Sequence, residues 1–185
     1  MKTLCVVIAC LVLTVAVKSR CLAQAEDAPA FDDFRVAVWR GRVAALNLNS
    51  HPLARKFRTA SREQIKEEGV NFAGHYTLVS VGCGTGCSIS GMVDSRTGKA
   101  YFPKEFIGWT IIVGDYDPPD GEEQWTFRAD SRLLRAIGRP NIGRPSEERY
   151  GASGIYYYEW SKNRLRLVKS IPVGSYPKAD PPVRR

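Results

Sequence analysis

The stretch from Asn71 to Cys87 reads NFAGHYTLVSVGCGTGC, and the β-rich organisation of the chain extends outward from it. Residues from His75 to Val81 are mostly β-formers and predict a strand. The glycine-rich run that follows predicts a tight turn, and Ser88 to Asp94 predict a returning strand. The stretch therefore predicts an antiparallel hairpin with Cys83 and Cys87 at its tip.

Turn and strand signals alternate after this hairpin. Asp94 to Lys99 predict a turn, because an aspartate bonds its own downstream backbone and Gly98 tolerates a positive φ. A short strand is expected from Ala100 to Phe102, with Pro103 ending it. Alternating apolar residues predict three further strands, and a loop rich in glycine and proline covers 138–153. These strands span Trp109–Val113, Gln124–Arg128 and Leu133–Ile137.

A closing hairpin is predicted near the C-terminus, from Ile155 to Trp160 and from Arg164 to Val168. Successive strand residues face opposite sides, so Tyr156, Tyr158 and Trp160 share one face. Side chains of this size on one face of a strand indicate a wall of the core rather than a platform for a ligand.

Toward the N-terminus the pattern predicts one strand and one helix. Phe34 to Arg40 is rich in β-formers and predicts a strand. Ser50 as N-cap, Pro52 in the first turn and Gly69 beyond the end indicate a helix over residues 52–68. Its apolar face is expected to contain Leu53, Phe57, Ala60 and Ile65. The predicted fold class is mainly β (α+β): an antiparallel meander sheet or partly closed barrel with one packed N-terminal helix.

Residues 1–25 have the organisation of a secretory signal peptide. A basic start at Lys2 precedes the apolar run Leu4–Val17, and Ala23-Gln-Ala25 offers a cleavage site. The run is too short for a comfortable membrane span, and the mature form is expected to contain none. Residues 26–171 have the length of a single β-rich domain, and the proline-rich residues 172–185 predict an extended, disordered tail. The protein is therefore expected in the periplasm or outside the cell.

The charge of the chain limits the classes of partner. The full sequence has a net charge of +8, and removal of residues 1–25 lowers it to +5 because Lys2, Lys18 and Arg20 are lost. A modest basic excess outside the cytoplasm fits an envelope protein partner or an anionic envelope polymer. Nucleic acid is not expected, because export separates the protein from it and the basic residues are scattered.

The spacing of Cys83 and Cys87 favours a local disulfide. Both cysteines lie in a flexible glycine-rich loop of a chain expected to be exported. Three alternatives remain at this stage: a redox pair, a zinc site that includes His75, and a Cys–His nucleophile. Each lacks a partner that its chemistry requires, such as further zinc ligands. No cofactor, metal or catalytic residue is therefore predicted.

The segment Asp115–Glu123 is a second concentration of functional groups, because it contains five carboxylates. Calcium binds such oxygen clusters, but the spacing does not match an EF-hand loop. Two prolines and a glycine indicate a surface turn first, with calcium as the alternative.

Four motifs together resemble a family of small exported bacterial proteins of uncharacterised activity: Asn71–Tyr76, Gly82–Cys87, Val93–Lys99 and Tyr156–Trp160. The resemblance covers most of residues 50–168. It implies a secreted or periplasmic bacterial protein, and it implies no activity.

The functional hypothesis is a non-enzymatic binding or interaction module whose disulfide-closed loop forms part of a recognition surface, as in an inhibitor or immunity protein. The candidate binding residues are His75, Tyr76, Gly84, Thr85 and Gly86, with Cys83 and Cys87 as the disulfide. The alternative is a cell-envelope hydrolase or metal-dependent enzyme that uses His75 with Cys83 and Cys87, or the Asp115–Glu123 loop.

Overall fold

The structure is a computed structural model that describes residues 28–110, 123–143 and 151–172. The predicted signal peptide and all but the first residue of the predicted tail lie outside the described residues, as does most of the Asp115–Glu123 loop. Contacts divide the chain into two units, Met1–Ala30 and Phe31–Arg185. The second unit contains the helices and strands described below.

The first sheet is built on the predicted hairpin. Strands β1 (Tyr76–Gly84) and β2 (Cys87–Asp94) pair antiparallel, which confirms the hairpin. Two short strands, β3 (Ala100–Tyr101) and β4 (Ile107–Thr110), pair with β2 at its opposite ends. The short 3-10 helix η2 (Lys104–Phe106) lies between β3 and β4 in the chain.

The second sheet is an antiparallel meander in the order β5-β6-β7-β8. Its strands are β5 (Trp125–Phe127), β6 (Leu133–Gly138), β7 (Gly154–Ser161) and β8 (Arg164–Pro172). The mainly β, α+β class with antiparallel pairing is confirmed. The strands are divided between two sheets, however, and among the described residues neither sheet closes into a barrel.

The turn between β2 and β3 has the predicted chemistry. The Asp94 carboxylate accepts hydrogen bonds from the Arg96 backbone N–H at 2.9 Å and from the Thr97 hydroxyl at 3.0 Å. Gly98 has a φ of 72°, in the left-handed region that glycine tolerates. Its C=O accepts a hydrogen bond from the Asn47 N–H at 2.8 Å, so the segment before the helices packs directly on this turn.

The predicted single helix is two helices, α2 (Pro52–Lys56) and α3 (Arg58–Glu68), with a break at Phe57. The N-cap also differs from the prediction: His51 caps α2 through its ring nitrogen. The Ser50 hydroxyl instead accepts a hydrogen bond from the Ala100 N–H at 3.0 Å, because Ser50 lies beside β3. Gly69 ends α3 with a φ of 59°, as expected. In the described part of the chain, no helix has the length and apolar character needed to cross a membrane.

The helices cover one face of the first sheet. The residues that they bury against it differ in part from the predicted apolar face. Ala54 and Ser61 are the buried residues of α2 and α3, and Ile65 packs beside them. Of the predicted apolar face, Ile65 packs against this core as expected, whereas Leu53, Phe57 and Ala60 are half-buried and belong to neither core cluster. The core beneath the helices also contains Leu46, Val79, Val93 and Ala100.

The predicted strand over Phe34–Arg40 is wrong. Residues Phe31–Phe34 form the 3-10 helix η1, and Arg35 makes one isolated bridge with Ser131. The Val36 and Trp39 N–H groups then bond to the Asp130 and Gly74 carbonyls. The segment is extended because it bonds to successive turns of the fold, and it joins no ladder.

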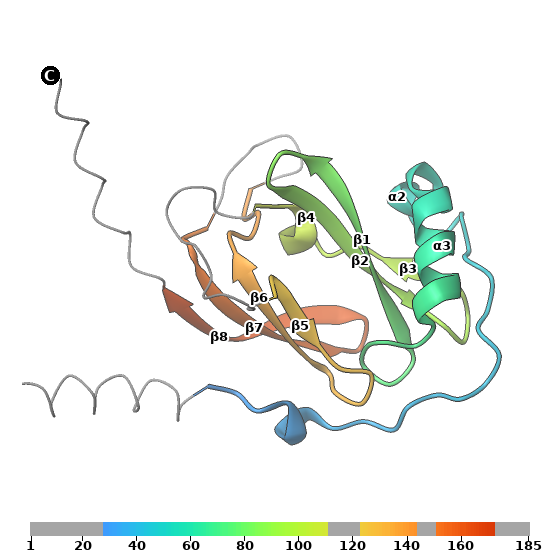
Figure 1. Cartoon of the computed structure of the whole chain (residues 1–185), viewed down its shortest axis with the longest axis horizontal. Coiled ribbons are helices and arrows are strands. Elements are labelled where there is room, and N and C mark those ends of the chain that lie inside the picture. The colour runs from blue at the N-terminus through green and yellow to red at the C-terminus, as the bar shows by residue number, and fades with distance from the viewer. Residues whose placement is uncertain (1–27, 111–122, 144–150, 173–185) are drawn as a thin grey trace, which may run out of the picture. The chain divides into compact units, whose positions relative to one another are not determined.

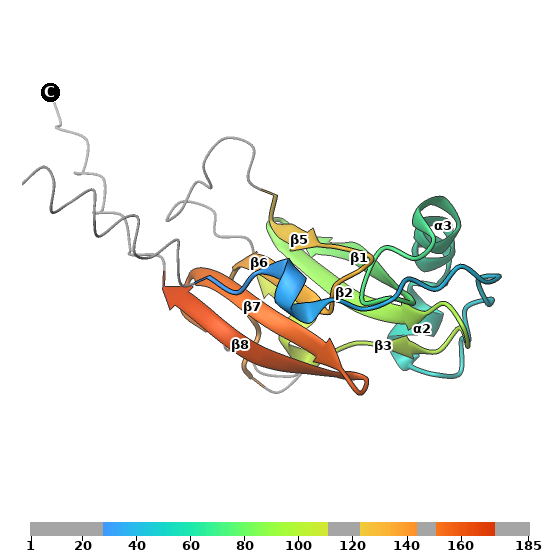
Figure 2. The ribbon, with the colours of Figure 1, turned by 90° about the horizontal axis from the view of Figure 1, so that it is seen from below.

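The main core lies between the two sheets. Leu78 and Met92 point into it from β1 and β2, whereas their neighbours Val79 and Val93 point toward the helices, as the period of a strand requires. The second sheet contributes a buried aromatic wall, which confirms the prediction for Tyr156, Tyr158 and Trp160. Phe106 and Trp109 lie between these layers, fully buried. Figures 1 and 2 show the helices and the second sheet on opposite sides of the first sheet.

Two side-chain amides cap the outer edge of β1. The Asn71 amide accepts a hydrogen bond from the Leu78 N–H at 2.8 Å and donates to the Leu78 C=O at 3.5 Å. The Gln64 amide pairs with the Ser80 N–H and C=O in the same way, at 2.8 and 2.9 Å. These amides replace a neighbouring strand, so this part of the edge is satisfied without another chain.

Candidate functional site

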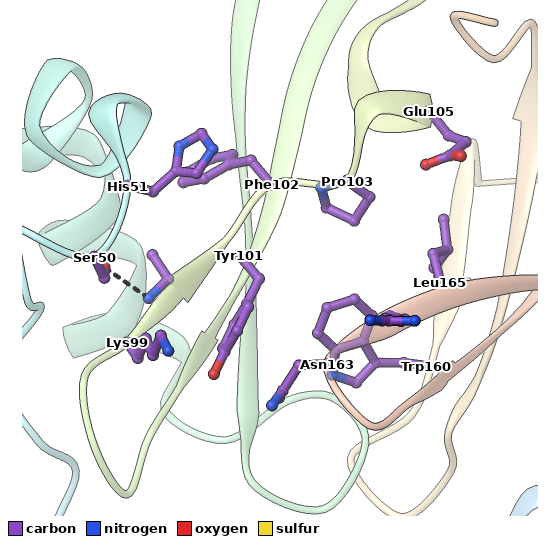
Figure 3. A pocket seen from close by; sticks show the side chains of 12 residues that line it. Ser50, His51, Lys99, Tyr101, Phe102, Pro103, Glu105, Trp160, Asn163 and Leu165 are labelled. Atoms are coloured by element: carbon purple, nitrogen blue, oxygen red, sulfur yellow. Dashed lines mark hydrogen bonds between the residues drawn. The ribbon is translucent and has the colours of Figure 1, made fainter.

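A groove of about 440 Å³ opens between three parts of the fold: the residues before α2, strand β3 with the residues after it, and the β7–β8 hairpin. Figure 3 shows the side chains that line it. We call it the aromatic groove, and its lining is Ser50, His51, Lys99, Ala100, Tyr101, Phe102, Pro103, Glu105, Trp160, Asn163, Arg164 and Leu165.

Aromatic rings form the base of the aromatic groove. Trp160 is 2% exposed, and its ring meets those of Tyr101 and Tyr76 edge to face, with centroids 5.8 and 5.6 Å apart. Edge-to-face pairs of this kind stabilise each other beyond their buried area. Tyr76 of β1 therefore lies beneath the base of the groove and packs against Tyr101 of β3 and Trp160 of β7.

The β7–β8 turn forms one wall of the groove. Lys162 and Asn163 both have a positive φ, 52° and 58°, which is the geometry of a two-residue type I′ hairpin turn. The Tyr76 hydroxyl donates a hydrogen bond to the Asn163 side-chain oxygen at 2.6 Å. This bond joins the first sheet to the turn of the second, so the wall is held in place before any ligand binds.

The opposite wall is held by residues Ser50 and His51. The bond from the Ala100 N–H to the Ser50 hydroxyl, drawn in Figure 3, attaches this wall to β3. The His51 ring packs on Phe102 with centroids 5.0 Å apart, and its Nδ1 accepts a hydrogen bond from the Leu53 N–H at 3.1 Å. Because Nδ1 is an acceptor, neutral His51 carries its proton on Nε2 and can donate there.

The rim of the aromatic groove carries two exposed cations and one half-buried carboxylate. The Lys99 ammonium lies 5.5 Å from the centre of the Tyr101 ring, a cation–π distance. Arg164 is exposed at the start of β8. Figure 3 shows Tyr101 standing between Lys99 and Asn163, with Glu105 at the other end of the groove. The rim is thus cationic where the aromatic surface is exposed.

Burial fixes the protonation states of the groove at neutral pH. Burial raises the pKa of Tyr101, and the Asp94 carboxylate adds to this rise. Burial also raises the pKa of Tyr76, which the Trp160 indole partly offsets. The pKa of His51 is lowered by burial. The phenols are therefore hydrogen-bond donors and His51 is neutral, so the described groove offers polar recognition groups and aromatic surface.

His75, a predicted binding residue, immediately precedes β1, and its side chain makes local contacts. Arg96 Nη2 contacts its Nε2, and the Asp94 carboxylate lies 4.0 Å from the same atom. Burial lowers the pKa of His75, Arg96 lowers it further, and Asp94 opposes them. Since arginine has only donors, the contact requires a neutral His75 with Nε2 as acceptor. Its ring packs on Tyr76, with centroids 4.2 Å apart, and thereby adjoins the aromatic groove.

Tyr76, the second predicted binding residue, begins β1 and lies beneath the groove, whereas Gly84, Thr85 and Gly86 lie at and beyond the opposite end of β1. The disulfide between Cys83 and Cys87 is present, with a Cα–Cα separation of 5.1 Å, and Gly84 and Thr85 are exposed beside it. Gly86 turns the tip with a φ of 66°. This confirms the disulfide that the spacing predicted.

The structure separates His75 from the disulfide tip. Cys83 follows His75 by eight residue steps of nearly continuous strand, which corresponds to about 26 Å at roughly 3.3 Å per residue. The three residues are therefore not brought together in one site. In the described ranges, no group of three or more His, Cys, Asp or Glu side chains could hold a metal ion. Of the predicted Asp115–Glu123 cluster, only Glu123 belongs to the described residues.

Sequence reasoning missed most of the aromatic groove. Tyr101 and Arg164 lie in predicted strands, Asn163 lies between the strands of the predicted closing hairpin, and His51 directly precedes the predicted helix, so the pattern singles out none of them as a binding residue. One signal is visible in retrospect: Lys99 precedes the pair Tyr101–Phe102, so a cation and two rings lie together. The groove unites segments far apart in the chain, and no local pattern shows this.

No protein-family model matches this chain, and no match is found among the curated proteins or the solved structures. The groove and the fold therefore carry the functional argument by themselves.

The N-cap role of His51 predicts a pH dependence of stability. Its folded pKa lies below the ordinary value of 6.5, so as pH falls the unfolded chain takes up a proton first. The stabilisation from neutral His51 is therefore present above pH 6.5 and is lost as the pH falls through the folded pKa. The protonated His51 ring also no longer accepts the hydrogen bond from the Leu53 N–H. We expect the free energy of unfolding to decrease between about pH 7.5 and 5.5.

Urea unfolding at several pH values tests this, with His51→Asn as the matched variant because asparagine retains a capping acceptor without titrating. We expect a shallower pH dependence in the variant. His75 also has a lowered pKa and acts in the same direction, so part of the slope will remain. An identical slope in both proteins would contradict the role of His51.

Proposed function

We propose that this protein is a non-enzymatic binding module that acts in the periplasm or outside the cell, and that the aromatic groove is its recognition site. The ligand carries an anionic group on a ring that can pack one face on an aromatic side chain and present hydroxyl groups to the polar lining. The observation that carries this proposal is the half-buried Tyr101 ring, which packs on the buried Trp160 ring, with Lys99 and Arg164 at the rim. The local disulfide supports an oxidising compartment.

The size and chemistry of the groove support binding of a small ligand or of one unit of a larger one. Its volume of about 440 Å³ lies within the usual range for ligand sites of about 300–1,000 Å³. Such sites combine apolar and aromatic surface with a few placed polar groups. Here these groups include the Asn163 amide, the Glu105 carboxylate and the two cations.

The groove is also held in its open form by the protein itself. The Tyr76–Asn163 bond fixes one wall, and the Ser50–Ala100 bond fixes the other. Because both walls are ordered before binding, the ligand does not have to order them. A preformed site of this kind supports a recognition function.

The titratable groups favour binding over catalysis. His51 is neutral, and its Nδ1 is occupied by the N-cap bond. Glu105 is the one carboxylate in the described lining, whereas glycoside hydrolysis ordinarily uses two. The alternative hypothesis, a hydrolase or metal-dependent enzyme, receives little support because His75 and Cys83 lie at opposite ends of β1.

The interaction hypothesis that places an inhibitor-like contact at the Cys83–Cys87 loop remains a separate prediction. The tip is exposed and closed by the disulfide, which supports a surface role. It lacks the enclosed volume and aromatic surface of the groove, so the groove is the better-supported site.

Calorimetric titration with digalacturonate, a dimeric sugar acid, tests the proposed function. We expect measurable binding that weakens about tenfold in Tyr101→Ala and in Arg164→Ala, about 1.4 kcal/mol each. Lys66→Ala, an exposed cation on α3, is the control and should bind as the unmodified protein does. Thermal melts monitored by circular dichroism establish that each variant is folded. Absence of binding, or equal binding by all four proteins, would contradict the proposal.

A further inference from the structure

A second hollow shares His51 with the aromatic groove. It has a volume of about 490 Å³ and is formed by the residues before α2, by α2 itself and by the start of α3. We call it the basic hollow, and its lining is Leu48, Asn49, His51, Pro52, Arg55, Lys56 and Arg58. His51 belongs to both linings, so the two hollows are neighbours that share one side chain.

The charge of the basic hollow is not balanced by its own lining. Arg55, Lys56 and Arg58 are all exposed, and none of the described residues that line the hollow is acidic. Two of the cations have defined positions. Arg55 donates a hydrogen bond to the Asn49 side-chain oxygen at 2.6 Å, and the Lys56 ammonium lies 5.2 Å from the centre of the Phe57 ring.

We propose that the ligand is a linear acidic polysaccharide that occupies the aromatic groove and continues past His51 into the basic hollow. This inference rests on the proposed function, because it takes the groove as the first part of the site. Cations lie along both hollows, from Arg58 to Arg164, with Glu105 as the one acidic lining residue. A ligand with one carboxylate per unit matches this repeated charge, whereas a compact ligand fills one hollow only.

The polar lining selects a polysaccharide over a peptide strand. An extended peptide binds a sheet edge through free backbone groups. The Ala100 N–H of β3 faces the groove but is already bonded to the Ser50 hydroxyl. The side-chain polar groups of the lining include the Tyr101 phenol, the Asn163 amide and the Glu105 carboxylate. They suit the hydroxyl groups of a sugar, which donate and accept hydrogen bonds.

The same lining selects against nucleic acid. A single strand binds through stacked bases and a uniformly basic channel. In the described lining of the aromatic groove Trp160 is 2% exposed and Tyr101 is half-buried, so these rings do not form a row of open faces for successive bases. The Glu105 carboxylate accepts hydrogen bonds from sugar hydroxyls, which phosphates do not supply.

The test compares digalacturonate with a long oligogalacturonate on the full chain. Binding of the dimer measures the affinity of the aromatic groove alone. The gain, which is the increase in affinity from the dimer to the long oligomer, measures the contribution of the basic hollow. We expect the long oligomer to bind at least about tenfold more tightly, with a gain that falls as salt is added. In the double variant Arg55→Gln/Lys56→Gln the gain should disappear while the dimer binds as before. The control variant Arg62→Gln/Lys66→Gln removes the same charge from α3, outside the lining of the basic hollow, and should retain the gain.

Three outcomes would overturn the inference while the proposed function stands: equal binding of dimer and long oligomer, a gain that persists in Arg55→Gln/Lys56→Gln, or a gain lost equally in the control. An equal or larger gain with poly-glutamate or with a single-stranded oligonucleotide would overturn the choice of a polysaccharide. Failure of every galacturonate to bind would instead count against the proposed function itself. A neutral gluco-oligosaccharide of the same length is expected to show no gain.

Discussion

Replacement of Gly98 by alanine should destabilise this protein more than any other single-methyl addition to its turns. Gly98 has a φ of 72°, and a Cβ there would lie 1.9 Å from the Ala45 carbonyl oxygen. The left-handed conformation costs a residue with a Cβ about 1 kcal/mol or more, and the overlap forces the backbone to move at a further cost of about 1–3 kcal/mol. We expect a loss of about 2–4 kcal/mol.

Two other glycines separate these effects. Gly69 has a φ of 59° and a ψ of −138°, outside the left-handed helical region, with no atom near its Cβ position, so Gly69→Ala should cost about 1–3 kcal/mol through backbone strain alone. Gly82 has neither a positive φ nor a near neighbour, so Gly82→Ala should change stability by less than about 0.5 kcal/mol. Thermal unfolding measures the series, at about 2–4 °C per kcal/mol for a chain of this length. An unchanged midpoint for Gly98→Ala would contradict the turn geometry, and with it the position of Lys99 on the groove.

Truncation of Trp109 to alanine should be the most damaging change in the core. Trp109 is fully buried, and its ring contacts those of Phe106, Trp125, Tyr156 and Tyr158. Its indole N–H donates a hydrogen bond to the Ile137 C=O at 3.1 Å. Removal of a buried aromatic residue of this size typically costs about 3–5 kcal/mol, because the surrounding side chains collapse only partly into the cavity.

Trp109→Phe and Trp39→Ala are the matched comparisons, with urea unfolding as the measurement. Phenylalanine retains much of the packing but leaves the Ile137 C=O without its donor, at an expected cost of about 1–3 kcal/mol. Trp39 is 42% exposed, so its loss should cost less than about 1 kcal/mol. Equal losses for Trp109→Ala and Trp39→Ala would mean that the two sheets do not pack around Trp109.

Sequence patterns predict correctly the turns and strand faces whose geometry depends on residues close together in the chain. The alternation in Tyr156, Tyr158 and Trp160 places their side chains on one face, and burial of that face against the first sheet needs no further information. The turn from Asp94 to Lys99 is similar, because its hydrogen bonds lie within six residues. Hairpins, turns and the class of fold could therefore be predicted.

Tertiary contacts decided the elements that sequence reasoning missed. The run from Phe34 to Arg40 has strand composition. The Val36 and Trp39 N–H groups, however, bond to the Asp130 and Gly74 carbonyls, which are distant in sequence. Ser50 is a good N-cap by type, yet β3 lies beside it and its hydroxyl accepts from Ala100. His51 then becomes the cap. Residue type shows that a strand or an N-cap is possible at these positions. Contacts with neighbouring elements determine whether it forms.

The candidate site shows the same limit. His75, Cys83 and Cys87 are close in sequence and looked like one chemical cluster, but an extended strand moves its ends apart by its full length. The aromatic groove has the opposite property: Lys99 and Asn163 are distant in sequence and line the same hollow. Nothing in either segment alone indicates the other.

The most direct test of the central claim is a nuclear magnetic resonance titration of the ¹⁵N-labelled protein with digalacturonate. The account predicts that the backbone amide shifts concentrate on residues 99–102, at the base of the aromatic groove, and on residues 163–165, in its β7–β8 wall. Shifts concentrated on Gly84, Thr85 and Gly86 would assign recognition to the disulfide tip. That result, or a spectrum unchanged by the ligand, would contradict the account.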